Sequence, residues 1–194
     1  QHGFIDSVGF DLYSQMLQEA IEEKQTGVAK EDRPDVEISL PVNAYIPETY
    51  IKDGFQKIQM YKRVKAVDSE EDYRELVDEM IDRFGDLPFE AELLLRIARI
   101  KVLGRIAKVE SIKKQKTKIE VRFSSEGTAQ TNGAKLLNDS MQFGRAVGFS
   151  MDGDQLVLTV DEKHTGQQTD FDILESLMQL LPGALKEIAP SKSV

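Results

Sequence analysis

Two carboxylates and one guanidinium share a short stretch near the middle of the chain, at Glu79, Asp82 and Arg83. Their i, i+3, i+4 spacing places all three on one patch of a helix. Carboxylates accept charge-assisted, often bidentate, hydrogen bonds from arginines, and an arginine beside them pairs with an acid or stacks on an aromatic ring. The patch is therefore either ordinary solvated surface or the contact surface for a partner protein.

The charge around this patch favours a protein partner. Between Asp68 and Glu92 the sequence has eleven acidic residues and two basic ones, Arg74 and Arg83. Such a segment repels phosphate backbones and attracts basic protein surface. We therefore expect a contact with another protein surface here rather than with nucleic acid.

The patch lies at the end of a helix whose two termini are marked in the sequence. Ser69 followed by Asp72 predicts a capping box at its start, and Gly85 predicts a left-handed residue that ends it. Apolar residues recur between them with helical spacing, which predicts one face buried against a core. These residues are Tyr73, Leu76, Val77, Met80, Ile81 and Phe84.

The residues that catalysis usually requires are scarce. The chain has no cysteine, and its two histidines are His2 and His164, the second in a polar segment. No Gly-x-x-x-x-Gly-Lys-Ser/Thr phosphate loop occurs, and residues 152–154 read as a hairpin turn rather than part of a calcium loop. We expect no catalytic residue, no metal site and no cofactor in this chain.

Composition limits the class of protein. With 194 residues, 40% of them hydrophobic, the chain suffices for one ordinary domain with an appendage. Its net charge of -9 argues against nucleic acid as the main partner. The absence of cysteine and of any long apolar run predicts a soluble, cytoplasmic protein without a membrane partner. Because the chain starts at Gln1 rather than Met, we interpret it as a fragment of a larger protein.

Periodicity divides the chain into elements. Residues 9–24 predict an amphipathic helix, and 26–35 read as a linker, which places a boundary near residue 30. Residues 36–40 alternate as a short strand. A helix then opens at Pro47, followed by the helix of the patch and by one from Pro88 toward Ala107, interrupted at Gly104. These three consecutive helices predict one helical layer.

The second half predicts strands. Residues 109–123 form a hairpin joined across 113–116, and a second hairpin turns at 152–154 between strands 147–151 and 155–160. Helices are expected between the hairpins, at 132–144, and after them, at 171–181. Antiparallel pairs that are segregated from a helical run define an α+β fold.

Three stretches together resemble the bacterial transcription-repair coupling factors. Residues 1–13 resemble the end of that family's DNA-translocating motor, in which Gln1 matches the motor-side glutamine of the translocation motif. Residues 45–47 and 61–64 resemble the start of its C-terminal domain, and Glu79 through Gly85 resemble that domain's contact surface. The resemblance implies that 1–30 end the motor and that 31–194 form the C-terminal regulatory domain.

The resemblance also implies a function. A protein of this family binds a stalled RNA polymerase, translocates on DNA with a motor that uses ATP and Mg²⁺, and recruits excision repair. Its C-terminal domain, which is non-catalytic, docks on a recruiting domain similar to the second excinuclease subunit and masks the binding site for the damage-recognition ATPase. Carried over by motif, Glu79, Asp82 and Arg83 match the contact residues of that docking domain.

Two alternatives remain. The helix after Pro47 has a predicted apolar face and a basic outer face, and the first hairpin is also basic, which is compatible with a nucleic-acid-binding or motor-supporting module. An enzyme of unknown class is the third hypothesis. The apolar face comprises Ile51, Phe55, Ile58, Tyr61 (or Tyr50) and Val64, and the basic residues are Lys52, Lys57, Lys62, Arg63 and Lys65, with Lys113, Lys114, Lys116 and Lys118 on the hairpin.

Overall fold

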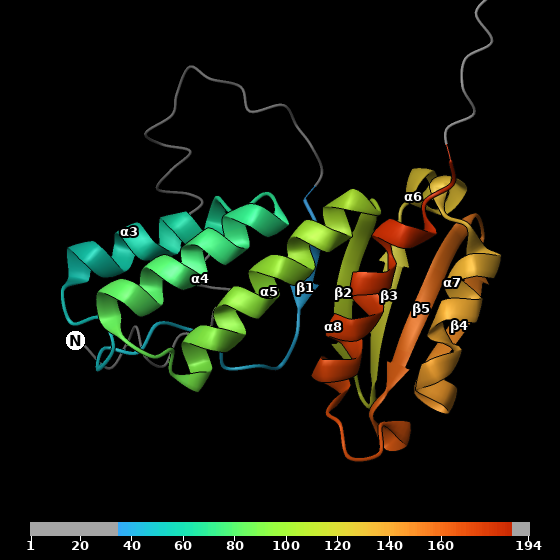
Figure 1. Ribbon diagram of the computed structural model, residues 1–194. Coiled ribbons are helices and arrows are strands. Elements are labelled where there is room, and N and C mark those ends of the chain that lie inside the picture. Colours follow the sequence, from blue (N-terminus) through green and yellow to red (C-terminus); the bar gives the residue numbers. More distant parts are fainter. Residues whose placement is uncertain (1–34, 188–194) are drawn as a thin grey trace, which may run out of the picture. The chain divides into compact units, whose positions relative to one another are not determined.

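The computed structural model describes residues 35–187, which divide into two compact units (Figure 1). The first unit spans residues 41–102, and the second combines 35–40 with 103–187. Gln1, the predicted helix at 9–24 and the boundary near residue 30 lie outside the described residues. The division into 1–30 and 31–194 therefore stays a prediction.

Three helices form the first unit, as the predicted helical layer requires. They are α3 (Gly54–Lys65), α4 (Glu70–Phe84) and the part of α5 (Phe89–Ile106) up to residue 102. The chain before α3 is tied to this layer, because the Tyr45 amide donates a hydrogen bond to the Glu90 carbonyl oxygen at 3.2 Å. The largest fully buried side chains of this unit are Ile46, Ile51, Met60, Leu76, Met80, Leu94, Leu95, Ile97 and Ile100.

Helix α3 starts later than predicted, and this changes its buried face. Asp53 caps the helix by accepting a hydrogen bond from the Gln56 amide at 3.0 Å, whereas Pro47 belongs to a preceding turn. A capping carboxylate satisfies an otherwise unpaired amide, so the helix begins after Asp53. The predicted apolar face was wrong at two positions: Phe55 and Ile58 are 70% and 40% exposed. Met60, Tyr61 and Val64 are the buried residues of α3.

Helix α4 has the predicted ends but a narrower buried stripe. Ser69 accepts from the Asp72 amide, and Gly85 follows with a φ of 89° that only glycine adopts readily, although its ψ of -169° is not left-handed helical. The Asp72 carboxylate accepts from the Asp68 amide at 3.1 Å, one residue before the predicted capping-box partner. Leu76 and Met80 are buried, whereas Ile81, predicted to be buried, is 41% exposed.

Gly104 does not interrupt α5, contrary to the sequence-based expectation. The helix continues through it, and the glycine instead allows close packing in the second unit. A Cβ at this position would lie 3.0 Å from the Val36 Cγ2 atom and 3.6 Å from the Met178 Cε atom. The lack of a Cβ at Gly104 therefore allows α5 to pack closely against Val36 and Met178, and it does not end the helix.

A five-stranded sheet in the order β1-β2-β3-β5-β4 forms the frame of the second unit. Both predicted hairpins are present and are joined edge to edge, because β3 pairs with β5 in antiparallel fashion. The first strand pairs with β2 in parallel, so the sheet is mixed rather than purely antiparallel. The strands are β1 (Glu37–Ser39), β2 (Val109–Gln115), β3 (Lys118–Phe123), β4 (Val147–Asp152) and β5 (Gln155–Asp161).

Helices pack in front of this sheet, where Figure 1 shows α7 and α8. The predicted C-terminal helix is confirmed as α8 (Asp170–Leu180), and the helix predicted at 132–144 is split. Its first part is α7 (Gly133–Ser140), capped by Asn132, and it is followed by the 3₁₀ segment η1 (Met141–Ala146), in which Gly144 is non-helical. A further short helix, α6 (Ser125–Gln130), was not predicted. The remaining 3₁₀ turns are η2 (Glu162–His164) and η3 (Pro182–Ala184). The α+β class is confirmed.

Candidate protein-interaction site

Glu79 is the centre of a small charge network between α3 and α4. Its Oε2 atom accepts a hydrogen bond from Arg63 Nη1 at 2.6 Å, and Arg83 Nη1 lies 3.4 Å from the same oxygen. Arg63 comes from the last turn of α3, and Arg83 lies one turn after Glu79 on α4. The Glu79 side chain is 35% exposed and that of Arg63 is 45% exposed, so the network lies at the surface.

The two arginines keep Glu79 ionised. The hydrogen bond from Arg63 is the largest cause that lowers the pKa of the Glu79 carboxyl below its ordinary value of 4.5. Partial burial opposes this effect, and the charges of both arginines and the bond from Arg83 add to it. Glu79 is thus a fixed negative charge at neutral pH, already partnered within the chain.

Arg83 makes both kinds of contact that its sequence context suggested. Besides Glu79, its guanidinium carbon lies 4.9 Å from the centre of the Phe84 ring. A guanidinium over an aromatic face is favourable because the face carries partial negative charge. Arg83 is therefore held between an acid and a ring, with its side chain 37% exposed.

Asp82 differs from its two neighbours because it is exposed and makes no hydrogen bond or ion pair within residues 35–187. On the outer face of α4 it continues a row of exposed acids at i, i+4, i+7 and i+11: Glu71, Glu75, Asp78 and Asp82. Of the three predicted contact residues, Asp82 is the one whose carboxylate is fully available to a partner.

Tyr50 fixes the end of α4 that carries these residues. Its hydroxyl lies 2.8 Å from the Gly85 carbonyl oxygen and 3.0 Å from the Met80 carbonyl oxygen, so one hydrogen is shared between two acceptors. The Tyr50 ring meets Phe84 edge-on with centroids 5.8 Å apart. Burial, followed by the charge of Asp86, raises the pKa of Tyr50, which keeps its donor proton in place.

Sequence reasoning missed the roles of Tyr50 and Arg63. Arg63 was assigned to a basic outer face, because nothing local shows that α3 brings it to Glu79 across sixteen positions. Tyr50 was predicted to lie inside the helix that opens at Pro47, as an alternative to Tyr61 on its apolar face. Both contacts depend on how helices pack, which periodicity does not encode.

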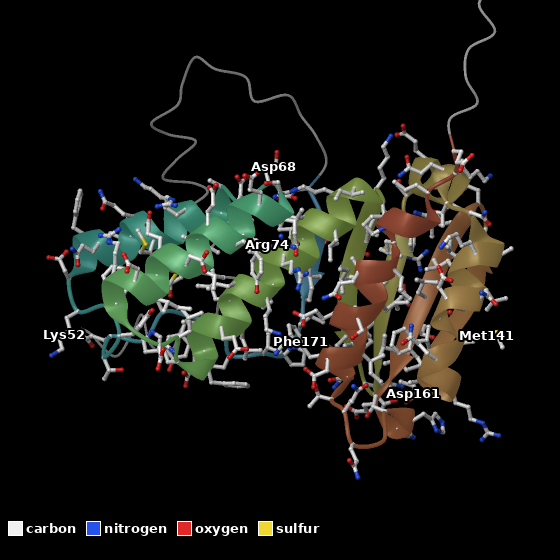
Figure 2. The ribbon with its side chains drawn as sticks, viewed as in Figure 1. Lys52, Asp68, Arg74, Met141, Asp161 and Phe171 are labelled. Carbon is white, nitrogen blue, oxygen red and sulfur yellow. The ribbon has the colours of Figure 1, made fainter. Side chains whose placement is uncertain are left out.

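Each of the two predicted basic faces is partly neutralised by acidic side chains. On the hairpin, Lys113 pairs with Glu37 at 3.2 Å, and Lys114 pairs with Glu162 and Asp170 at 2.6 and 2.8 Å. On the α3 side, Lys52, Lys57 and Lys62 have no ion-pair partner within the described part of the chain. Figure 2 shows Lys52 pointing away from the helices.

Other site types find little support in residues 35–187. No group of three or more His, Cys, Asp or Glu side chains there is arranged to hold a metal ion. No helix in that range is long and apolar enough to cross a membrane. His164 is exposed in η2.

The fold belongs to a defined class of domain. Residues 40–134 match the family model of the TRCF domain. A solved structure described as the C-terminal domain of transcription-repair coupling factor superposes with a TM-score of 0.66 at 28% identity, covering 75% of this chain and 90% of that one. Residues 40–134 therefore form a TRCF domain.

Full-length relatives agree with this assignment. The chain is 47% identical over 188 residues to the transcription-repair-coupling factor of Bacillus subtilis, and 41% identical over 187 residues to that of Staphylococcus haemolyticus. These matches cover 97% and 95% of this chain but 16% of each relative. The chain belongs to the transcription-repair coupling factor family, and it corresponds to the C-terminal domain.

Proposed function

We propose that this domain is a non-catalytic regulatory module that docks, through the end of α4, on a recruiting domain of its parent protein. The recruiting domain resembles the second excinuclease subunit. Docking masks its binding site for the damage-recognition ATPase until a stalled RNA polymerase is engaged. The parent would supply the ATP- and Mg²⁺-dependent motor that moves on DNA, to which Gln1 would contribute, and the domain itself would need no cofactor.

One observation carries this proposal: Asp82, whose carboxylate has no partner within residues 35–187, stands on a helix end that neighbouring side chains hold by hydrogen bonds. Tyr50 ties the end of α4, and the Arg63–Glu79–Arg83 network fixes the adjacent face. A rigid, exposed acid beside oriented charges is suited to bind an arginine, and the surrounding acidic row attracts a basic surface.

A polar contact also suits a reversible clamp. Regulatory coupling needs only about 1 to 3 kcal/mol, and two domains of one chain meet at a high effective concentration. A modest, charged interface can therefore close within the parent protein and open again when another partner binds.

The test is charge reversal in the full-length parent. Replacing Glu79 and Asp82 together by lysine is expected to expose the recruiting domain, so that binding of the damage-recognition ATPase rises. Asp82→Lys should act alone in the same direction. Asp154→Lys, an equal change at an exposed turn in the second unit, serves as the control. If binding does not rise while the domain stays folded, the docking role of these residues is wrong.

A second candidate function has one observation in its favour. On α3 and just before it, Lys52, Lys57 and Lys62 lack described partners, and Phe55 of the same helix is 70% exposed. Unpaired cations and an exposed aromatic ring are features of sites that bind single-stranded nucleic acid. A gel shift at low salt tests this: complex formation that Lys52→Ala and Lys62→Ala abolish would support it, and no complex removes it.

A further inference from the structure

Arg63 occupies the acceptor oxygen that a docking partner would need on Glu79. Both internal hydrogen bonds end on Oε2, at 2.6 Å from Arg63 and 3.4 Å from Arg83. The other oxygen, Oε1, accepts no hydrogen bond from any residue in 35–187. Glu79 therefore offers one free oxygen and one that is already engaged.

This division limits what a partner arginine can do. A guanidinium binds a carboxylate best when two parallel N–H groups reach both oxygens. While Arg63 remains on Oε2, an incoming arginine has room for a single-oxygen contact on Oε1. Full bidentate contact requires Arg63 to move away, and its side chain is exposed enough to do so, at 45%.

We propose that Arg63 is an internal competitor of the docking partner, which weakens docking and so makes the clamp easier to release. The inference rests on the proposed function, since it concerns the regulation of the same site. On this proposal the docking partner binds Glu79 through a guanidinium, and Arg63 takes the place of that guanidinium in the undocked state. Arg63 thus weakens docking, whereas Glu79 and Asp82 strengthen it, although all three belong to one charged surface.

The expected size of the effect is modest. Exposed ion pairs are weak and screened by salt, so removing the competitor should tighten docking by about two- to fivefold. Because screening weakens the Arg63–Glu79 pair, the effect should shrink as ionic strength rises.

The experiment uses the full-length parent and its binding of the damage-recognition ATPase. Arg63→Met is placed in the Asp82→Lys background, which exposes the recruiting domain enough for a decrease to be measured. Arg63→Met should lower the binding by about two- to fivefold as docking tightens. Arg145→Met, which removes an exposed arginine of the second unit that has no partner within the described residues, is the matched control and should leave binding unchanged.

A double-mutant cycle with Glu79→Gln tests whether Arg63 changes docking through its contact with Glu79. If Arg63 acts by occupying Glu79, Arg63→Met should have no further effect once Glu79 is replaced. Thermal melts of each variant confirm that the domain is folded. An unchanged or increased binding in Arg63→Met overturns the proposal, and an increase would mean that Arg63 orients Glu79 for docking. If Asp82→Lys itself fails to raise binding, the proposed function fails instead.

Discussion

The hydroxyl of Tyr50 lies 2.8 Å from the carbonyl oxygen of Gly85, thirty-five positions further along the chain. The last carbonyls of a helix lack partners within the helix, and a side-chain donor that reaches them stabilises its end. Here the donor, Tyr50, precedes α3, and the acceptor, Gly85, follows α4. The hydrogen bond therefore joins the segment before α3 to the segment after α4. Asp82 and Arg83 lie in the turn that this contact closes.

Tyr50→Phe should destabilise the domain while keeping its ring packing. The change removes one shared hydrogen bond, which corresponds to about 0.5 to 1.5 kcal/mol of unfolding free energy in urea denaturation. Tyr45→Phe is the control, because the Tyr45 hydroxyl makes no hydrogen bond within the described residues. Equal stability of the two variants would show that the Tyr50 contact does not hold the end of α4.

The Glu79 network should give the domain a distinct acid dependence. The arginines lower the folded-state pKa of Glu79 below 4.5, so the unfolded state binds its proton first as the pH falls. The stabilisation is therefore complete above the unfolded pKa and is lost as the pH drops through the folded one. Unfolding free energies of the unmodified chain and Glu79→Gln should differ at pH 7 and converge as the pH falls from 4.5 through the folded-state pKa of Glu79.

Asp82→Asn is the control for removing a carboxylate charge from α4, because Asp82 has no described partner and the substitution keeps its size. At pH 7 it should lower the unfolding free energy less than Glu79→Gln does. A Glu79→Gln difference that does not change with pH would contradict a stabilising ion pair at this position.

In the second unit, Lys114 should be the most important lysine of the first hairpin. It lies between Glu162 and Asp170, and its side chain is 17% exposed. The hydrogen bonds that it donates to these two acids raise its pKa, with the bond to Asp170 as the larger cause. Lys114→Met should lower the unfolding free energy at pH 7 by about 1 to 3 kcal/mol, because two acids lose their donor. Lys118→Met, an exposed change in the same hairpin, should cost much less, and similar losses would contradict this ranking.

Local signals predicted the α4 helix well. Ser69 and Gly85 act through bonds and angles within a few residues, so their effect is readable in the sequence. For α3, the start predicted at Pro47 put Ile51 inside the helix, and Phe55 and Ile58 follow it at helical spacing. Because α3 begins only after Asp53, the buried Ile51 lies outside the helix and does not indicate which face of α3 is buried.

Contacts between distant segments could not be predicted in the same way. The parallel pairing of Ile38 with Ile112 joins strands that lie far apart in the chain, and no turn residue marks it. Likewise, the acid–base composition around Glu79 was visible, but not that Arg63 would neutralise part of it. The candidate site was thus predictable as a charged patch on a helix, and its division into paired and free carboxylates required the fold.

Gly127 should tolerate no side chain, because α6 begins directly against the end of α5. A Cβ there would lie 2.5 Å from the carbonyl oxygens of Ala107 and Lys108, and backbone atoms cannot move aside as a flexible side chain does. The Lys108 carbonyl also accepts hydrogen bonds from the Ser124 amide and hydroxyl, at 2.9 and 2.7 Å. Gly127→Ala should therefore push α6 off this anchor and cost about 1 to 3 kcal/mol in urea denaturation.

Gly133→Ala provides the matched comparison for Gly127→Ala. Gly133 is the first residue of α7, and a Cβ there would have no neighbour within 4 Å. Because alanine favours helix over glycine by up to about 1 kcal/mol, this variant should be as stable as the unmodified chain or slightly more so. The same substitution is thus expected to lower the unfolding free energy at Gly127 and to leave it unchanged or raise it slightly at Gly133. The reason is that backbone carbonyl oxygens lie within contact distance of a Cβ only at Gly127. If both variants shift stability equally, the close approach of α6 to residues 107–108 does not limit the size of residue 127.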